Sequence, residues 1–283
     1  MKPAAFDYLR PASVGEAVAH LAEHGGDAKI LAGGQSLVPL LNFRMLRPSV
    51  LIDINRLTEL DYVREDGAGL RIGALTRHHT LEMSPLVREG FPVLGEAMAH
   101  VAHLAIRNRG TIGGSLSHAD PAAELPMIAV LLDAEIRTSS RSHSAERFFQ
   151  GPLTTALNED ELMTEIALPA LPPRTGWGFE EFARRHGDFA IAAVAATLTA
   201  SGGKIVAARL AAMGVGETPL RLSAVEASLV GQGFTPALAA AAGEQARASV
   251  QPFDDLHASA DYRRHLVAVL TERAVAAAWS RAI

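Results

Sequence analysis

The spacing of apolar and polar residues changes several times along the chain and predicts an alternation of helices and strands. Ser13 and Glu16 form a capping box, and apolar residues then recur at helical spacing: Ala17, Val18, Leu21 and Ala22. A Gly-Gly pair at 25–26 ends this helix. Short apolar runs at 29–31 and 50–54 predict buried strands, so the first part of the chain forms a small β-α-β unit.

The middle of the chain predicts a second region of mixed structure. Runs at 60–64 and 70–74 flank Asp66-Gly67, which is typical of a β-hairpin. We expect the following further elements here: helices over 81–104 and from Asp120-Pro121 onwards, and strands at 135–138 and 162–168.

A proline cluster at 169–173 predicts a linker, because prolines cannot continue a helix or an inner strand. Beyond it the pattern predicts three strands, at 179–184, 189–199 and 204–214. Helices follow at 223–229, with a capping box at Ser223 and Glu226, at 235–250 and at 261–282. Strands followed by packed helices predict an α+β fold. We therefore predict two domains, 1–173 (subdomains about 1–57 and 58–173) and 174–283.

Composition narrows the function classes. The formal net charge is -5 and aromatic residues make up 5%, which disfavours binding to nucleic acid or to an anionic membrane. The chain has no cysteine, so it has no disulfide, no catalytic thiolate and no cysteine ligands for an iron–sulfur cluster. Its most apolar stretch, 189–200, is too short to span a bilayer, and its start lacks a secretory signal. We expect a cytoplasmic protein.

Two glycine-glycine segments carry the candidate chemistry. The first, at 30–37, contains Gly33-Gly34, and the second, at 111–116, contains Gly113-Gly114. Glycine pairs let the backbone take positive φ and approach a ligand closely, and successive N–H groups there bind anions. Either segment alone is most simply a tight connection between a strand and a helix. Together they suggest that two loops clasp one long phosphorylated ligand. The usual G-x-G-x-x-G dinucleotide fingerprint between a strand and a helix is absent.

These segments resemble a known family. The runs 32–37, 106–115 and Asp120-Pro121, together with 184–190, are similar to the FAD-binding medium subunits of molybdenum hydroxylases. That family includes the flavoproteins of carbon monoxide dehydrogenase, quinoline and nicotine dehydrogenases, and the flavin domain of xanthine dehydrogenase. The resemblance covers essentially the whole chain. It implies an α+β fold: a two-subdomain FAD-binding region of the vanillyl-alcohol-oxidase (PCMH) type, then a small C-terminal α+β domain with a three-stranded antiparallel sheet and helices.

The resemblance also implies the site. The first segment would wrap the pyrophosphate and ribityl chain, mostly through backbone N–H groups, and the second would add further phosphate and ribityl contacts. Asp120 would hydrogen-bond near the ribityl chain, and Phe189 would lie against the flavin ring, although Asp120 also suits a helix cap and Phe189 a core strand. The implied FAD-binding residues are Lys29, Ile30, Leu31, Ala32, Gly33, Gly34, Gln35, Ser36, Leu37, Thr111, Ile112, Gly113, Gly114, Ser115, Asp120 and Phe189.

Two positions depart from the family pattern. Ser115 stands where asparagine is usual, and Gln35 stands where carbon monoxide dehydrogenase flavoproteins carry histidine. The second difference favours a relative that acts on an N-heteroaromatic or other organic substrate.

The resemblance implies a flavoprotein oxidoreductase subunit without catalytic residues of its own. Electrons would arrive from iron–sulfur clusters on a small partner subunit, since this chain has no cysteine. The molybdenum cofactor would sit on a large partner subunit, in a heterotrimer often doubled into an (LMS)2 assembly. NAD, a quinone, oxygen or a carrier protein are all open as the terminal acceptor.

Other interpretations stay open. The chain could be a stand-alone FAD oxidoreductase of the vanillyl-alcohol-oxidase type, a carbon monoxide dehydrogenase medium subunit, or a non-catalytic scaffold that uses the glycine segments only as structure. Arg107 could equally contact phosphate or serve the structure. The pairs His20/His24 and His100/His103 have chelating spacing, but the sequence offers no third ligand, so we expect no metal site.

Overall fold

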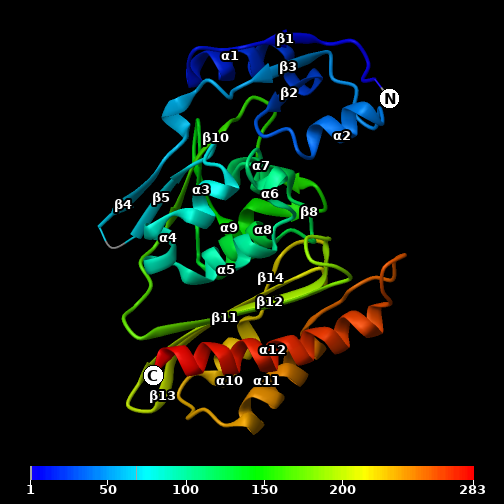
Figure 1. The fold of residues 1–283 in the computed structure, drawn as a ribbon. Coiled ribbons are helices and arrows are strands. Elements are labelled where there is room, and N and C mark those ends of the chain that lie inside the picture. The colour runs from blue at the N-terminus through cyan, green and yellow to red at the C-terminus, as the bar shows by residue number, and fades with distance from the viewer. Residues whose placement is uncertain (1, 68) are drawn as a thin grey trace.

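The computed structural model describes residues 2–67 and 69–283, and it arranges them in three tiers. Figure 1 shows a small N-terminal sheet at the top, a mixed region of short helices and a larger sheet in the middle, and a C-terminal sheet with long helices at the bottom.

The N-terminal tier is a parallel sheet of three strands in the order β1-β3-β2: β1 Asp7–Leu9, β3 Val50–Asp53 and β2 Ala28–Leu31. Helix α1 (Val14–His24) begins as predicted, because the Ser13 hydroxyl accepts a hydrogen bond from the Glu16 N–H at 3.1 Å. Gly25 ends it with a φ of 53°. The predicted β-α-β unit is confirmed, and β1 is an added strand. Helix α2 (Leu37–Asn42) follows the first glycine segment.

The middle tier contains an antiparallel sheet in the order β4-β5-β10-β6-β7. Its strands are β4 Val63–Asp66, β5 Gly69–Gly73, β10 Met163–Leu168, β6 Glu135–Thr138 and β7 Ser142–Ser144. The predicted hairpin is therefore confirmed as β4 and β5. A separate two-stranded sheet, β8 (Phe149–Gly151) with β9 (Thr154–Thr155), follows α9 (Ala145–Phe148).

The helical pattern predicted over 81–104 is broken into short helices. Pro85 and Pro92 each occupy a first helical turn, where a proline fits, and neither could continue a preceding helix. The resulting helices are α3 His78–Met83, α4 Pro85–Gly90, α5 Pro92–His100 and α6 Leu104–Arg107.

Two local predictions in this region were wrong. The second glycine segment is the start of a helix, α7 (Ile112–His118), which Thr111 caps by accepting the Gly114 N–H. Pro121 does not open the next helix, because α8 spans Glu124–Leu131. Asp120 instead closes a local turn, in which its Oδ1 accepts the N–H of Ala122 at 2.9 Å.

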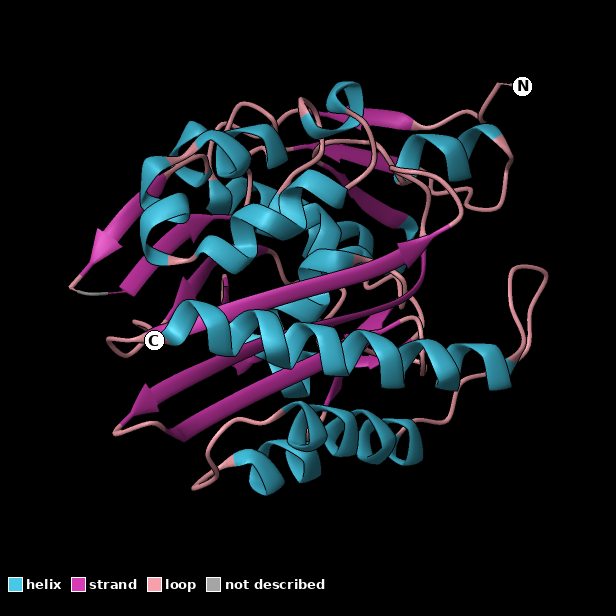
Figure 2. Ribbon diagram, turned by 60° about the horizontal axis from the view of Figure 1, so that its bottom comes forward, coloured by secondary structure: helices cyan, strands magenta, loops and turns pink. Residues whose placement is uncertain are grey.

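The C-terminal tier is an antiparallel sheet of four strands, where three were predicted. The missed strand is β14 (Leu220–Arg221), which pairs with β13 (Lys204–Met213); the other two are β11 (Thr175–Ala183) and β12 (Ala190–Ser201). Helices α10 (Ser223–Leu229), α11 (Pro236–Ser249) and α12 (Ala260–Ala282) confirm the predicted order. Figure 2 shows α12 lying along the sheet.

The expected capping box of α10 does not form. Ser223 lies inside the helix after Leu222, and no side chain caps it. Glu226 instead accepts the backbone N–H of Leu210 at 2.8 Å and pairs with Arg221, so it joins α10 to β13 and β14.

The middle and C-terminal tiers share one hydrophobic core. The helices of the middle tier pack on one face of the C-terminal sheet, so Phe179, Ala193, Ala211 and Met213 belong to the same buried cluster as α5 and α8. The opposite face of the sheet packs against α10, α11 and α12. Glycines at 176 and 178 let the backbone of α12 approach β11 closely. Within the described residues, none of the helices, α12 included, combines the length and hydrophobicity needed to cross a membrane.

Candidate functional site

The first glycine segment presents a row of free backbone donors. It leaves β2 at its C-terminal end, and Gly34 takes a φ of 72°. Among the described residues, no hydrogen bond uses the backbone N–H groups of Gly33, Gly34, Gln35 or Ser36. Gly34 instead uses its carbonyl to accept the N–H of Val38 at 3.0 Å. Consecutive unpaired amides at the end of a strand form a concavity that suits a phosphate oxygen.

The backbone that leads into the second glycine segment lies directly against the first segment. A Cβ placed on Gly33 would lie 2.8 Å from the Cα of Gly110 and closer still to the carbonyl oxygen of Arg109. The backbone of the first loop therefore rests on the backbone that leads into α7. Segments that are far apart in the sequence thus meet at one place, as their similar composition suggested.

A half-buried arginine joins the first segment to the residues that precede the second. The Arg77 guanidinium donates to the carbonyl of Arg109 and, at 2.7 Å, to Oδ1 of Asn55. Nδ2 of Asn55 in turn donates to the carbonyl of Ala32 at 2.9 Å. Burial lowers the pKa of Arg77 from its usual value. Sequence reasoning missed Arg77 and Asn55 because no motif marks them.

The second segment offers far fewer free amides than the first. The N–H groups of Ile112 and Gly113 donate to the carbonyls of Thr76 and Ala74, at 3.1 Å and 2.9 Å. Those of Gly114 and Ser115 are bonded to Thr111. Gly113 is small for a packing reason, because a Cβ there would lie 2.7 Å from that of Ala74. Contacts from this segment to a ligand therefore have to come from side chains, such as the partly exposed Ser115 hydroxyl.

The remaining predicted site residues lie on other loops. Phe189 stands just before β12 with 72% of its surface exposed, which is unusual for a large aromatic side chain. Its loop is packed through Gly187 against the ring of His103 and the carbonyl of Ala102, in the segment that leads to α6. Lys29 is exposed on β2. Within the described residues, no hydrogen bond joins Asp120 or Phe189 to either glycine segment.

The loop of Asp120 connects the site to the C-terminal tier. The carbonyl of Pro121, beside Asp120, accepts the N–H of Gly214 at 2.9 Å. The carbonyl of Gly214 and that of Ile191 both accept from the buried Arg263. The ends of β12 and β13 are thereby fixed against the loop that follows α7.

Arg107 has a structural role. Its guanidinium pairs with Glu82, with a distance of 2.9 Å from Nε to Oε2. It also donates to the carbonyls of Val101 and Ala102 at 3.0 Å and 3.1 Å. These bonds fix the segment before the second glycine loop, and they occupy the donors that a phosphate would need.

A buried acidic pair lies between the middle helices and β11, and sequence reasoning missed it. Glu124, at the start of α8, is 8% exposed, and its burial together with the charge of Glu181 raises the pKa of Glu124 to about 8. Nδ1 of His100 lies 3.8 Å from Oε1 of Glu181, which raises the pKa of His100. A single acidic residue at the head of the otherwise apolar run 124–132 was the available signal.

His78 is buried directly beneath the second glycine segment. Neither of its ring nitrogens has a hydrogen-bond partner among the described residues, and burial lowers the pKa of His78 to about 4. A Cβ on Gly110 would lie 2.8 Å from its Nδ1. The neutral ring therefore supports the backbone on which the first loop rests.

Comparison with known proteins identifies the class to which this fold and these loops belong. Residues 4–171 match the family model described as the FAD binding domain in molybdopterin dehydrogenase, and residues 177–278 match the CO dehydrogenase flavoprotein C-terminal domain. The chain therefore belongs to the family of FAD-binding medium subunits of molybdenum hydroxylases.

Particular relatives are similar over their full length. The caffeine dehydrogenase subunit beta of Pseudomonas sp. (strain CBB1) is 43% identical, covering 100% of this chain and 98% of the relative. The structure of carbon monoxide dehydrogenase from Hydrogenophaga pseudoflava superposes with a TM-score of 0.97 at 42% identity, covering 99% of each chain. Quinoline 2-oxidoreductase from Pseudomonas putida 86 gives a TM-score of 0.95 at 40% identity, covering 100% of this chain and 99% of that one.

Proposed function

We propose that this chain binds FAD beside its two glycine segments and acts as the electron outlet of a molybdenum hydroxylase. The observation that carries the proposal is the row of unpaired amides at 33–36, fixed against the backbone of Arg109 and Gly110. Membership in a family of FAD-binding subunits supports the same assignment.

The residues present suit a dinucleotide. The unpaired amides can donate to pyrophosphate oxygens without a charged side chain, as anion-binding loops commonly do. Glycine at these positions lets the loop adopt this form, since a Cβ on Gly33 would collide with the backbone of Arg109 and Gly110, and Gly34 takes a positive φ of 72°. Phe189, with its exposed ring, supplies an apolar surface on which a flavin ring can lie.

We assign the remaining residues as follows. Lys29 to Leu31 belong to the strand that precedes the unpaired amides at 33–36, and Ser36 and Leu37 lie at the start of α2. Thr111 to Gly114 form the supporting wall, and Ser115 contributes its hydroxyl. Asp120 faces the ribityl region.

When bound, FAD accepts electrons and passes them on, while the protein supplies binding, orientation and electrostatics. We propose that the electrons come from iron–sulfur clusters on a small partner subunit and leave to NAD, a quinone, oxygen or a carrier protein. A large partner subunit would hold the molybdenum cofactor, in an (LMS)2 assembly. An exposed aromatic ring at Phe189 would leave that side of the proposed flavin site accessible to an electron donor or acceptor.

We propose an N-heteroaromatic or other organic compound as the substrate of the whole complex. Similar relatives are named for caffeine and quinoline, which both contain ring nitrogen, and Gln35 replaces the histidine expected in carbon monoxide dehydrogenase flavoproteins. A carbon monoxide dehydrogenase medium subunit is the second candidate, since the structural superposition with that enzyme is equally close.

Flavin release tests the assignment. The purified chain should release one FAD per protein molecule on acid denaturation, and the denatured supernatant should show the flavin spectrum. Protein that is folded by circular dichroism, yet colourless and unable to take up added FAD, would refute the proposal. Co-purification of iron and molybdenum with the tagged chain would separate it from a stand-alone FAD oxidoreductase.

A further inference from the structure

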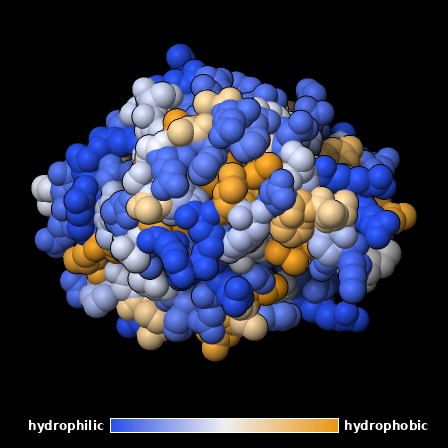
Figure 3. Space-filling view, turned by 90° about the horizontal axis from the view of Figure 1, so that it is seen from above, coloured by the Kyte–Doolittle hydropathy of each residue, from blue (hydrophilic) through white to orange (hydrophobic). Residues whose placement is uncertain are grey.

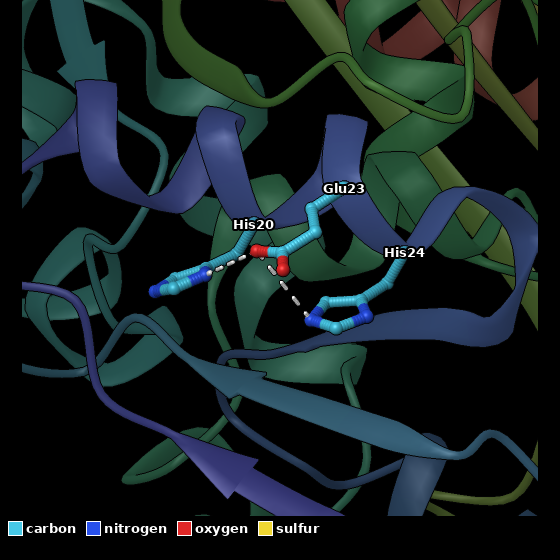
Figure 4. Close-up of side chains that lie close together, drawn as sticks. All are labelled: His20, Glu23 and His24. Atoms are coloured by element: carbon cyan, nitrogen blue, oxygen red, sulfur yellow. Dashed lines mark ion pairs between the residues drawn. The ribbon is translucent and has the colours of Figure 1, made fainter.

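Helix α1 carries a cluster of metal-ligating side chains that the flavin site does not use. Figure 4 shows His20, Glu23 and His24 pointing toward one another from the last two turns of the helix. One ligand atom from each lies within 4.8 Å of those of the other two. The spacing of the two histidines alone offered no third ligand; the structure places the Glu23 carboxylate beside both.

The geometry of the cluster is close to that of a metal site. Nδ1 of His20 lies 3.7 Å from Oε2 of Glu23, and Nε2 of His24 lies 3.9 Å from the same oxygen. Ligands bound to one tetrahedral zinc ion at about 2.0–2.1 Å are separated by about 3.4 Å. Each histidine therefore lies a few tenths of an ångström farther from the carboxylate than in the bound arrangement, and side-chain rotations have to draw together three ligand atoms that lie within 4.8 Å of one another.

The helix keeps these side chains in place. Ala17 and Leu21 of the same helix are buried in the N-terminal core, so the backbone under the cluster is fixed. The two imidazole rings already lie nearly parallel, with centroids 6.5 Å apart and an interplanar angle of 23°. Residues at i and i+4 on a helix face the same side, which brings the two rings over one position.

A fourth residue lies near one ligand, just beyond hydrogen-bond distance. Oε1 of Glu16 lies 3.8 Å from Nε2 of His20, the ring nitrogen that faces away from Glu23. A carboxylate on the far nitrogen of a ligating histidine holds the ring in the tautomer that leaves the near nitrogen free to bind the metal. Glu16 is itself fixed, because its Oε2 accepts the N–H of Ala12 at 2.6 Å.

We propose that His20, Glu23 and His24 form a zinc-binding site on α1, with water completing the coordination. Two imidazoles and one carboxylate are ligands that Zn²⁺ accepts readily, whereas Mg²⁺ and Ca²⁺ prefer oxygen ligands only. The bound ion would join the last two turns of α1, immediately before the turn at Gly25 that leads into β2 and the amide row. The site would therefore stabilise the N-terminal tier, and it is independent of the proposed flavin function.

Equilibrium dialysis of the full-length chain against Zn²⁺, after treatment with a chelator, tests the site. We expect one high-affinity Zn²⁺ per chain, and a rise in the thermal midpoint when zinc is added. His20→Ala and His24→Ala should each weaken binding by about tenfold or more, and Glu23→Gln should weaken it while keeping the shape of the side chain. His257→Ala, which removes an exposed histidine elsewhere, is the matched control and should bind zinc as the unchanged chain does.

Substitution of Co²⁺ gives a second measurement that does not depend on affinity. Visible absorption from bound Co²⁺ should be seen in the unchanged chain and in His257→Ala, and it should be lost in the double variant His20→Ala/His24→Ala. Far-UV circular dichroism checks that this variant folds. Equal zinc binding by the unchanged chain and the double variant, or an unchanged Co²⁺ spectrum, would overturn the proposal.

Discussion

Gly33 rests on the carbonyl of Arg109, so the loop after β2 and the segment before α7 touch through backbone atoms alone. No side chain separates them, and Arg77 bonds to the same carbonyl from the other side. The position of the free amides at 33–36 thus depends on a contact that tolerates only glycine. This contact makes the loop rigid before any ligand arrives, which lowers the entropic cost of binding.

Gly33→Ala should therefore weaken FAD binding. The added methyl group collides with backbone that cannot rotate away, and we expect about a tenfold or larger loss of FAD affinity, with about 1–3 kcal/mol of lost stability. Gly90→Ala makes the same change where a Cβ meets nothing within 4 Å and serves as the control. Normal flavin content in purified Gly33→Ala would contradict the assignment of this loop.

Phe189→Ala should weaken flavin binding without destabilising the fold. The ring is 72% exposed, so its loss removes little buried area, and surface changes of this kind usually alter stability by less than about 0.5 kcal/mol. The measurements are the thermal midpoint and the dissociation constant for FAD from fluorescence titration. Phe253→Ala, at 51% exposure in the C-terminal tier, is the comparison. A large fall in stability with unchanged FAD affinity would assign Phe189 to packing instead.

Glu124→Gln should make stability less dependent on pH above the acid range. The pKa of Glu124 in the folded chain is about 8, above the usual value of 4.5, so this group stabilises the fold fully below about pH 4.5 and that stability is lost as the pH rises through 8. We expect about 1–3 kcal/mol more loss between about pH 5 and 8 in the unchanged chain than in Glu124→Gln. Urea unfolding across that range measures it. Exposed Glu244→Gln should follow the unchanged chain.

His78→Leu should reduce the loss of stability at acidic pH. The pKa of His78 is depressed to about 4, so the unfolded chain takes up a proton first, and stability falls as the pH drops from about 6.5 to 4. Leucine cannot titrate and leaves no buried nitrogen without a partner, so we expect it to remove about 2–3 kcal/mol of this acid-side loss. Acid unfolding curves of the unchanged chain, of His78→Leu and of His257→Gln provide the test. The same loss of stability with falling pH in all three proteins would contradict the prediction.

The sequence predicted those features that local pattern controls. The Ser13 cap of α1, the hairpin of β4 and β5 and the helix α12 each depend on neighbouring residues, and each was confirmed. The other half of the predicted capping box differs, because the Glu16 carboxylate accepts the N–H of Ala12 instead of that of Ser13. The failures depend on partners that are distant in sequence. Strand β14 has only two residues and forms by pairing with β13. Glu226 does not take part in the predicted capping box, because its carboxylate pairs with Arg221 and accepts the N–H of Leu210.

The candidate site divides in the same way. The sequence pattern pointed to Gly33-Gly34 and Gly113-Gly114. It could not show that the N–H groups of Gly113 and Gly114 are already bonded to Ala74 and Thr111. Glycine is required at 113 because Ala74 packs closely against it. From the sequence alone, a glycine needed for packing cannot be told from one needed for ligand binding. Arg77, Asn55 and Glu124 act through tertiary contacts, so no local motif identified them.

The core shared by the middle and C-terminal tiers has a practical consequence for anyone dividing the protein. Cutting the chain within the proline-rich segment 169–173 would bare the alanine-rich side of β12 and β13 on one fragment and the helices that cover it on the other. Each fragment would then expose a large apolar surface and tend to aggregate. The proline-rich joint is thus a crossing point between two layers that share one core.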